Sequence, residues 1–151
     1  MRLNKTLFVG MFAMILALGI APIVYAQSCE YYISSGRFVF PDGSTMICYS
    51  GVPEYRNNPD AINLQDRGPI PTGAFYITGV TSSKGPNTIV LQPDGNNNMY
   101  GRHSFLIHGD NSSGNASQGC IVMGPTGRQK VVDAYNRARS NGAYLTLYVY
   151  R

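Results

Sequence analysis

A histidine and a cysteine lie twelve residues apart in a segment that can carry nucleophilic chemistry. His108 ends an apolar run, and Cys120 follows a loop rich in glycine and serine. A thiolate is a strong nucleophile when a neighbouring group takes its proton, and an imidazole can do this and later protonate a leaving amine. A loop of this length can fold back and bring the two side chains together. The spacing therefore predicts cysteine-dependent acyl transfer.

Two glycines beside this pair fit the same chemistry. Gly119 lets a substrate carbonyl approach the backbone closely, and the backbone amides of Gly119 and Cys120 are candidates for an oxyanion hole. Gly109 directly follows the candidate base, so its carbonyl is free to orient the second imidazole nitrogen.

Other interpretations of these residues stay open. A buried structural cysteine and an ordinary histidine at a strand end would produce the same pair. His103 is the weaker candidate for the base, because on a strand over residues 104–108 it faces away from His108. Zinc is disfavoured, since the histidines and cysteines show no C-x-x-C or matching ligand spacing. We therefore expect no metal site.

Short strands joined by turns must position these residues. The 151 residues are 44% apolar and 13% charged, with 17 glycines and 9 prolines, which excludes a coiled coil and a disordered chain. We predict a mainly β fold, a twisted sheet or sandwich of short strands with one α-helix after the active-site loop. Residues 51–68 are predicted to form a loop. The expected strands cover residues 31–34, 37–40, 44–50, 74–80, 88–92, 104–108, 121–123 and 143–150.

The helix is predicted to begin near residue 126. Thr126 and Gln129 have the spacing of a capping box. Apolar residues recur at helical spacing between Val131 and Ala138, and residues 140–142 (Ser-Asn-Gly) should end the helix.

The first 26 residues are typical of a secretory signal peptide. A basic start precedes an apolar run and a small-x-small end at Ala26, so cleavage there would leave residues 27–151 as the catalytic domain, with no stable membrane insertion. An uncleaved anchor and a lipid-modified Cys29 are the alternatives. Each places the domain in the cell envelope or periplasm. The net charge falls from +4 to +2 when Arg2 and Lys5 are removed, leaving ten basic against eight acidic residues, which argues against a nucleic-acid partner.

The three cysteines cannot all pair within one chain. An oxidising compartment favours pairing, and Cys29 and Cys48 both lie in the first third of the chain. We expect a Cys29–Cys48 disulfide, with Cys120 kept as a thiol.

Two segments resemble the L,D-transpeptidase catalytic domain family. FLIHGDNSSGNASQGCIVM is similar to the family's active-site signature, in which a histidine and a variable loop precede Ser/Thr-x-Gly-Cys. GPIPTGAFYI resembles the family's upstream strand, in the Gly-Pro-Ile-Pro form of a small subfamily. That subfamily includes type VI secretion effectors that attack peptidoglycan in rival cells. The resemblance runs from about Gly36 to the C terminus.

The resemblance implies a role for each matching residue. Cys120 would be the nucleophile and His108 the general base and acid, with the Gly109 carbonyl as third member of the triad. The amides of Gly119 and Cys120 would form the oxyanion hole, and Ser117 would brace the loop.

The sequence departs from the family pattern at two places. Gln118 stands where the family usually has a second histidine, and Val122 and Met123 occupy the place of the usual arginine. Arg102 or Arg128 could bind the substrate carboxylate instead.

The implied reaction is cleavage of the bond between the diamino acid and D-alanine in a peptidoglycan stem peptide. The acyl-enzyme would pass to an amine, to water or to a D-amino acid, which makes the protein an L,D-transpeptidase or an L,D-carboxypeptidase without a cofactor. One alternative is a non-catalytic wall-binding envelope protein. Another is an antibacterial effector, which would have an immunity protein as partner.

Overall fold

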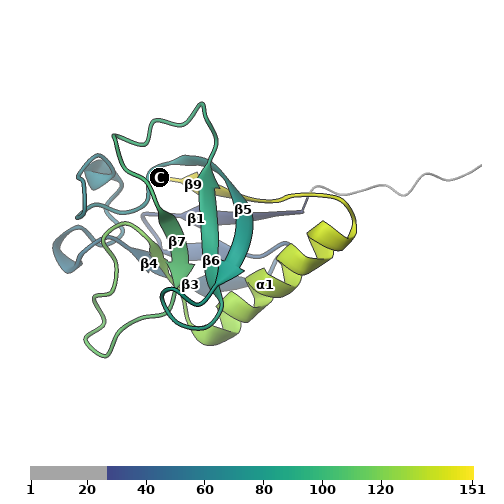
Figure 1. Ribbon diagram of the computed structural model, residues 1–151. Coiled ribbons are helices and arrows are strands. Elements are labelled where there is room, and N and C mark those ends of the chain that lie inside the picture. Colours follow the sequence, from purple (N-terminus) through teal and green to yellow (C-terminus); the bar gives the residue numbers. More distant parts are fainter. Residues whose placement is uncertain (1–26) are drawn as a thin grey trace, which may run out of the picture.

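One curved sheet and one helix build the domain, as the computed structural model shows for residues 27–151 (Figure 1). The predicted signal peptide, residues 1–26, lies outside these described residues. The strands are β1 (Gln27–Tyr32), β2 (Arg37–Val39), β3 (Thr45–Ile47), β4 (Tyr49–Ser50), β5 (Gly73–Thr81), β6 (Thr88–Pro93), β7 (Phe105–His108), β8 (Ile121–Val122) and β9 (Leu145–Tyr150). The helix is α1 (Pro125–Ser140).

The sheet curls towards a barrel. Its strand order is β3-β2-β1-β9-β5-β6-β7-β8-β4. The two outermost strands, β3 and β4, are separated in the chain by Cys48 alone. A single residue cannot bridge the width of a flat nine-stranded sheet, so the two edges must approach each other. This confirms the predicted mainly β fold with one helix after the active-site loop.

The core lies inside this curl, and alternation along the strands selects its members. On β9 the side chains of Leu145, Leu147 and Val149 are buried, while Tyr148 and Tyr150 are exposed. The predicted strand over 44–50 is divided at Cys48 into β3 and β4. β1 begins at Gln27, four residues earlier than expected, because it pairs in parallel with β9 from its first residue.

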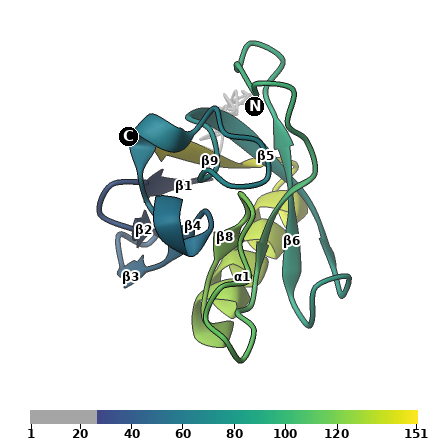
Figure 2. The ribbon, with the colours of Figure 1, turned by 90° about the vertical axis from the view of Figure 1, so that its left-hand side faces the viewer.

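The helix packs along one side of the sheet, as Figures 1 and 2 show. Its buried residues include Val131, Ala134 and Ala138, the stripe that its periodicity predicts. It ends at Ser140, with Gly142 in the left-handed region at φ +67°, as the sequence indicates.

The predicted capping box at the start of the helix is wrong. Gly124 is the N-cap, it makes no side-chain cap, and Pro125 is the first helical residue. Proline favours this position because its φ is already helical and its missing N–H would be unpaired there. Thr126 and Gln129 therefore lie inside the helix.

The predicted loop over residues 51–68 contains two short 3-10 helices, η1 (Pro53–Tyr55) and η2 (Pro59–Ala61). It docks on the segment that carries Cys120, since the Gly51 N–H donates to the Ser117 hydroxyl at 2.9 Å. The segment before the cysteine is therefore held by a part of the chain far away in sequence.

Candidate active site

A pocket of about 280 Å³ contains both residues of the predicted catalytic pair. His108, the last residue of β7, and Cys120, directly before β8, both line it. β7 and β8 pair in parallel, with Ile107 opposite Ile121, so the ladder brings the two residues to one place. The other lining residues are Gln65, Asp66, Lys84, Arg102, His103, Ser104, Phe105, Leu106, Ala116, Gln118 and Gly119.

The imidazole of His108 is held in one tautomer. Its Nδ1 lies 2.7 Å from the carbonyl oxygen of Gly109, and the side chain is only 4% exposed. A carbonyl oxygen can only accept a hydrogen bond, so Nδ1 carries a proton, and in the neutral imidazole the lone pair is therefore on Nε2. This is the tautomer that a general base requires, and the contact is the one expected from the position of Gly109.

The thiol of Cys120 is partly buried and rests against the backbone of residues 104–106, at the start of β7. Its Sγ lies 4.0 Å from the Ser104 carbonyl oxygen, and no hydrogen bond joins it to His108 in residues 27–151. Burial raises the pKa of this thiol, while the Leu106 N–H and the charges of Lys84 and Arg102 act in the opposite direction. The resting sulfur is therefore a neutral thiol that needs a base during attack.

Ser117 fixes the conformation of the cysteine loop. Its side chain is completely buried, and its hydroxyl accepts hydrogen bonds from the N–H groups of Gly51 (2.9 Å) and Gly119 (3.1 Å). The hydroxyl donates to the Cys120 carbonyl at 2.6 Å. The Ser117 side chain thus bonds to Gly119 and Cys120 in its own loop and to Gly51 in the neighbouring loop.

The expected oxyanion hole is only partly available. The Gly119 N–H is already used by Ser117, so it does not face a substrate. The Cys120 N–H makes no hydrogen bond to any described residue and is left as the free donor. The sequence could not show this difference, because it depends on where the Ser117 hydroxyl lies.

Arg102 packs against the cysteine loop at Gly119. It is 8% exposed, and its guanidinium donates to the carbonyls of Ile62 (2.7 Å), Pro69 (2.7 Å) and Gly68 (3.0 Å). A Cβ on Gly119 would lie 2.0 Å from Arg102 Nη2. The side chain considered for binding a substrate carboxylate is therefore engaged by backbone carbonyls and packed beneath the nucleophile.

Arg128, the other arginine considered, lies away from this pocket. It is 9% exposed, donates to the Met123 carbonyl at 2.8 Å and lines a different hollow together with Arg56 and Asp110. A Cβ on Gly109 would lie 2.4 Å from its Nη1. Arg128 thus supports the backbone behind His108 without facing the sulfur.

His103 does not point away from the site, contrary to the expectation. β7 begins only at Phe105, and Ser104 has a φ of +63°. Strand alternation does not extend through a residue in the left-handed region, so His103 and His108 line the same pocket. Gln118, which stands in the place of the family's second histidine, is exposed and lines the pocket too.

The structure contains no Cys29–Cys48 disulfide, since all three cysteines are free thiols. The strand register gives the reason. Glu30 pairs with Val39, whereas the Cys48 N–H bonds to the Gly36 carbonyl, which places the two cysteines about four residues apart along the meander. At ~3.3 Å per residue this exceeds the Cα separation that a disulfide can span.

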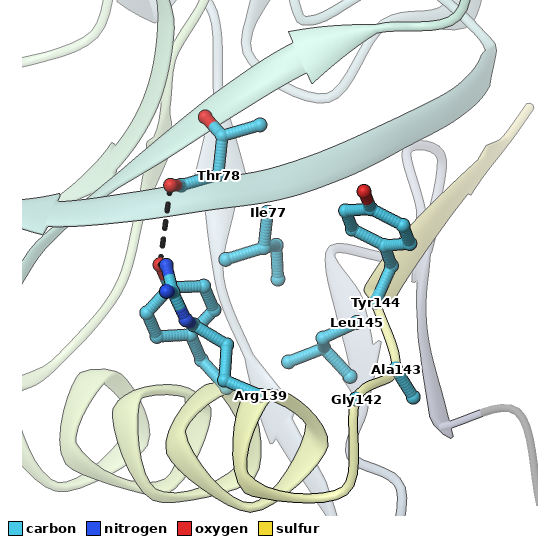
Figure 3. Close-up of a pocket in the computed structure, with 8 residues that line it drawn as sticks. Ile77, Thr78, Arg139, Gly142, Ala143, Tyr144 and Leu145 are labelled. Carbon is cyan, nitrogen blue, oxygen red and sulfur yellow. Dashed lines mark hydrogen bonds between the residues drawn. The ribbon is translucent and has the colours of Figure 1, made fainter.

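A second hollow, between the end of α1 and strands β5 and β9, has neither a cysteine nor a histidine among the described residues that line it (Figure 3). The Tyr135 hydroxyl there donates to the Thr78 carbonyl at 3.1 Å, and Arg139 donates to the same hydroxyl. Within residues 27–151, no three metal-ligating side chains come together, and no helix has the length and apolar character to cross a membrane.

The curled sheet, the single helix and the shared His–Cys pocket define a domain of the L,D-transpeptidase type. The chain belongs to the Tlde1 domain family, whose domain matches residues 44–146. Its fold is similar to the crystal structure of Mycobacterium tuberculosis L,D-transpeptidase 1, with a TM-score of 0.50 and 17% identity over 83% of this chain. The chain spans 60% of the length of that structure. No curated protein matches it. The resemblance to the L,D-transpeptidase family that the sequence shows is thereby confirmed.

Nothing in the sequence marked Lys84, Asp66, Ser104 or Leu106 as residues of the site. Lys84 stands in a turn between two predicted strands, and Asp66 stands in the long loop. Their chemistry becomes visible only when the fold brings those turns to the cysteine.

Proposed function

We propose that this protein is a cysteine acyltransferase that cleaves the bond between the diamino acid and D-alanine in peptidoglycan stem peptides. The observation that carries the proposal is the pocket that Cys120 and His108 both line, with the Nδ1 of the imidazole bonded to the Gly109 carbonyl. Family membership and the L,D-transpeptidase fold support peptidoglycan as the substrate. The protein would act in the periplasm or cell envelope.

In the first half-reaction the Cys120 sulfur attacks the diamino acid carbonyl while His108 Nε2 takes the thiol proton. A C–S bond forms, and the free N–H of Cys120 donates to the oxygen that becomes negative. The C–N bond then breaks, and His108 returns the proton to the amine of the departing D-alanine. This leaves a thioester on Cys120 and a neutral imidazole.

In the second half-reaction His108 takes a proton from the incoming nucleophile, which attacks the thioester carbonyl. Water gives a shortened stem (carboxypeptidase), an amine of another stem gives a cross-link (transpeptidase), and a D-amino acid gives exchange. The sulfur departs as a thiolate and regains the proton from His108. Because burial raises the pKa of this thiol, it returns to the neutral form between cycles.

Two biological roles fit the same chemistry. An enzyme with an export signal would modify the wall of its own cell. Membership of the Tlde1 family favours an effector that attacks a rival's wall, with an immunity protein as its partner. The two roles share the catalytic residues and differ in the destination of the protein.

The proposal is tested by incubating the protein with tetrapeptide muropeptides and identifying the products by mass spectrometry. The native chain should release D-alanine, and Cys120→Ala should abolish the release while leaving the unfolding temperature unchanged. His108→Ala should retain the thiol but lose activity by roughly 10²–10⁴-fold, the usual contribution of a general acid–base. Release that continues in Cys120→Ala would exclude this nucleophile.

A further inference from the structure

Two cationic side chains, Arg102 and Lys84, line the pocket of Cys120, and they differ in whether protein groups already bond to their charged ends. The Arg102 guanidinium is buried and donates to three backbone carbonyls. Lys84 is exposed, and its ammonium forms no ion pair or side-chain hydrogen bond with any residue from 27 to 151. Of the two, Lys84 can therefore bind a ligand without breaking contacts within the protein.

The backbone that carries Lys84 is well held. Its N–H donates to the Thr88 hydroxyl at 3.3 Å, and this hydroxyl donates to the Gly85 carbonyl at 2.7 Å. At the far end of the turn, the Asn87 amide donates to Gln129 of α1 at 2.8 Å. The turn between β5 and β6 thus holds the backbone of Lys84 in place, while its exposed side chain lines the pocket of Cys120.

Among residues 27–151, the only carboxylate on the pocket wall does not neutralise this lysine. Asp66 lines the same pocket, but its charge acts on Arg102, whose pKa it raises against the effect of burial. Asp66 forms no ion pair with Lys84. The positive charge of Lys84 acts to lower the pKa of Cys120, against the larger effect of burial. An unpaired positive charge close to the nucleophile suits an anionic group of the substrate.

In a stem peptide that ends one residue beyond the attacked carbonyl, the terminal carboxylate would lie within the pocket that Lys84 and Cys120 share. We propose that Lys84 binds the C-terminal carboxylate of the residue that leaves. The proposal rests on the proposed function and gives it a substrate preference. Stems with one residue beyond the diamino acid carry the carboxylate where Lys84 can reach it, whereas amidated or longer stems do not.

The same contact has a consequence for the second half-reaction. A free D-amino acid that enters as acceptor carries the same carboxylate at the same place as the departing D-alanine. Lys84 would therefore favour acceptors whose amine and carboxylate share one carbon over acceptors whose amine has no carboxylate beside it.

The test measures binding to the inactive Cys120→Ala protein by calorimetry, so that it does not depend on turnover. Two ligands are compared, a tetrapeptide with a free C-terminal carboxylate and the same peptide as its C-terminal amide. The variants are Lys84→Met, which keeps length without charge, and Lys84→Arg, which keeps the charge. Lys130→Met is the matched control, because Lys130 is the other lysine of residues 27–151 and lies on α1 beside Asp42.

The acid should bind about tenfold more tightly than the amide, the scale of one charge-assisted hydrogen bond in a half-open pocket. Lys84→Met should remove this preference, Lys84→Arg should restore it, and Lys130→Met should keep it. Equal binding of acid and amide by the parent would overturn the proposal. A preference that survives in Lys84→Met would do the same.

The activity assay separates this proposal from the proposed function. If the native enzyme releases no D-alanine but the acid still binds through Lys84, the proposed chemistry is wrong and the carboxylate site stands. If Lys84→Met lowers activity equally on acid and amide without changing their relative binding, Lys84 acts on the thiolate and the carboxylate site is refuted.

Discussion

Replacing Gly119 by alanine tests how the nucleophile loop is held. Gly119 has a φ of +129°, a conformation that costs a residue with a side chain about 1–3 kcal/mol. Its new Cβ would lie 2.0 Å from Arg102 Nη2 and 3.2 Å from Cζ. Arg102 is buried and cannot move without disturbing its bonds to three carbonyls, each worth roughly 1.5–3 kcal/mol for a charged donor.

With one of those bonds lost, Gly119→Ala should lower the free energy of unfolding by about 3–6 kcal/mol. Gly114→Ala is the matched control, since Gly114 lies in the same loop at φ +67° and has open space around its missing Cβ. It should cost only ~1–2 kcal/mol. For a domain of this size the difference corresponds to a Tm lower by roughly 10 °C.

Urea unfolding and thermal melting measure the effect, and a double-mutant cycle assigns its cause. Arg102→Met removes the guanidinium head, so the cost of Gly119→Ala should shrink in that background towards that of Gly114→Ala. If Gly119→Ala and Gly114→Ala destabilise the protein equally, packing against Arg102 does not hold the loop, and the reasoning is refuted.

Two further predictions concern buried groups. Ser117→Ala should cost about 2–4 kcal/mol in urea unfolding, because the buried N–H groups of Gly51 and Gly119 lose their acceptor, whereas Ser113→Ala at an exposed place in the same loop should change stability by under ~0.5 kcal/mol. A loss of similar size at both serines would contradict the bracing role. Burial raises the pKa of both Cys29 and Cys48 from 9.0 to about 12, so the unfolded chain releases these protons at lower pH than the folded one. Stability from these thiols should be complete below pH 9 and fall as pH rises towards 12, by up to ~1.4 kcal/mol per pH unit for each thiol. Unfolding measured from pH 8 to 11 should show the decline, and an equally steep slope after Cys29→Ala and Cys48→Ala would argue against this origin.

Much of the fold follows from local patterns. Strand alternation and turn residues located the strands, apolar spacing located the helix, and Ser140-Asn141-Gly142 marked its end. The predicted capping box was wrong because Pro125 fits the first helical position without any side-chain cap. The early start of β1 could not be predicted, since its partner β9 lies at the other end of the chain.

The sequence by itself determined which groups meet at the pocket in chemical terms: a thiol, an imidazole and the Gly109 carbonyl that holds the tautomer. These follow from residue type and from neighbours along the chain. Only the tertiary structure decided which of the surrounding groups are free. The Arg102 guanidinium is bonded to backbone carbonyls distant in sequence, and the Gly119 N–H is bonded to the Ser117 hydroxyl. His103 lines the pocket because Ser104 has a left-handed backbone conformation. Lys84 lines the pocket without an ion-pair partner among residues 27–151. Whether a polar group can bind a substrate depends on which protein groups already bond to it, and those partners are set by the packing of the whole sheet.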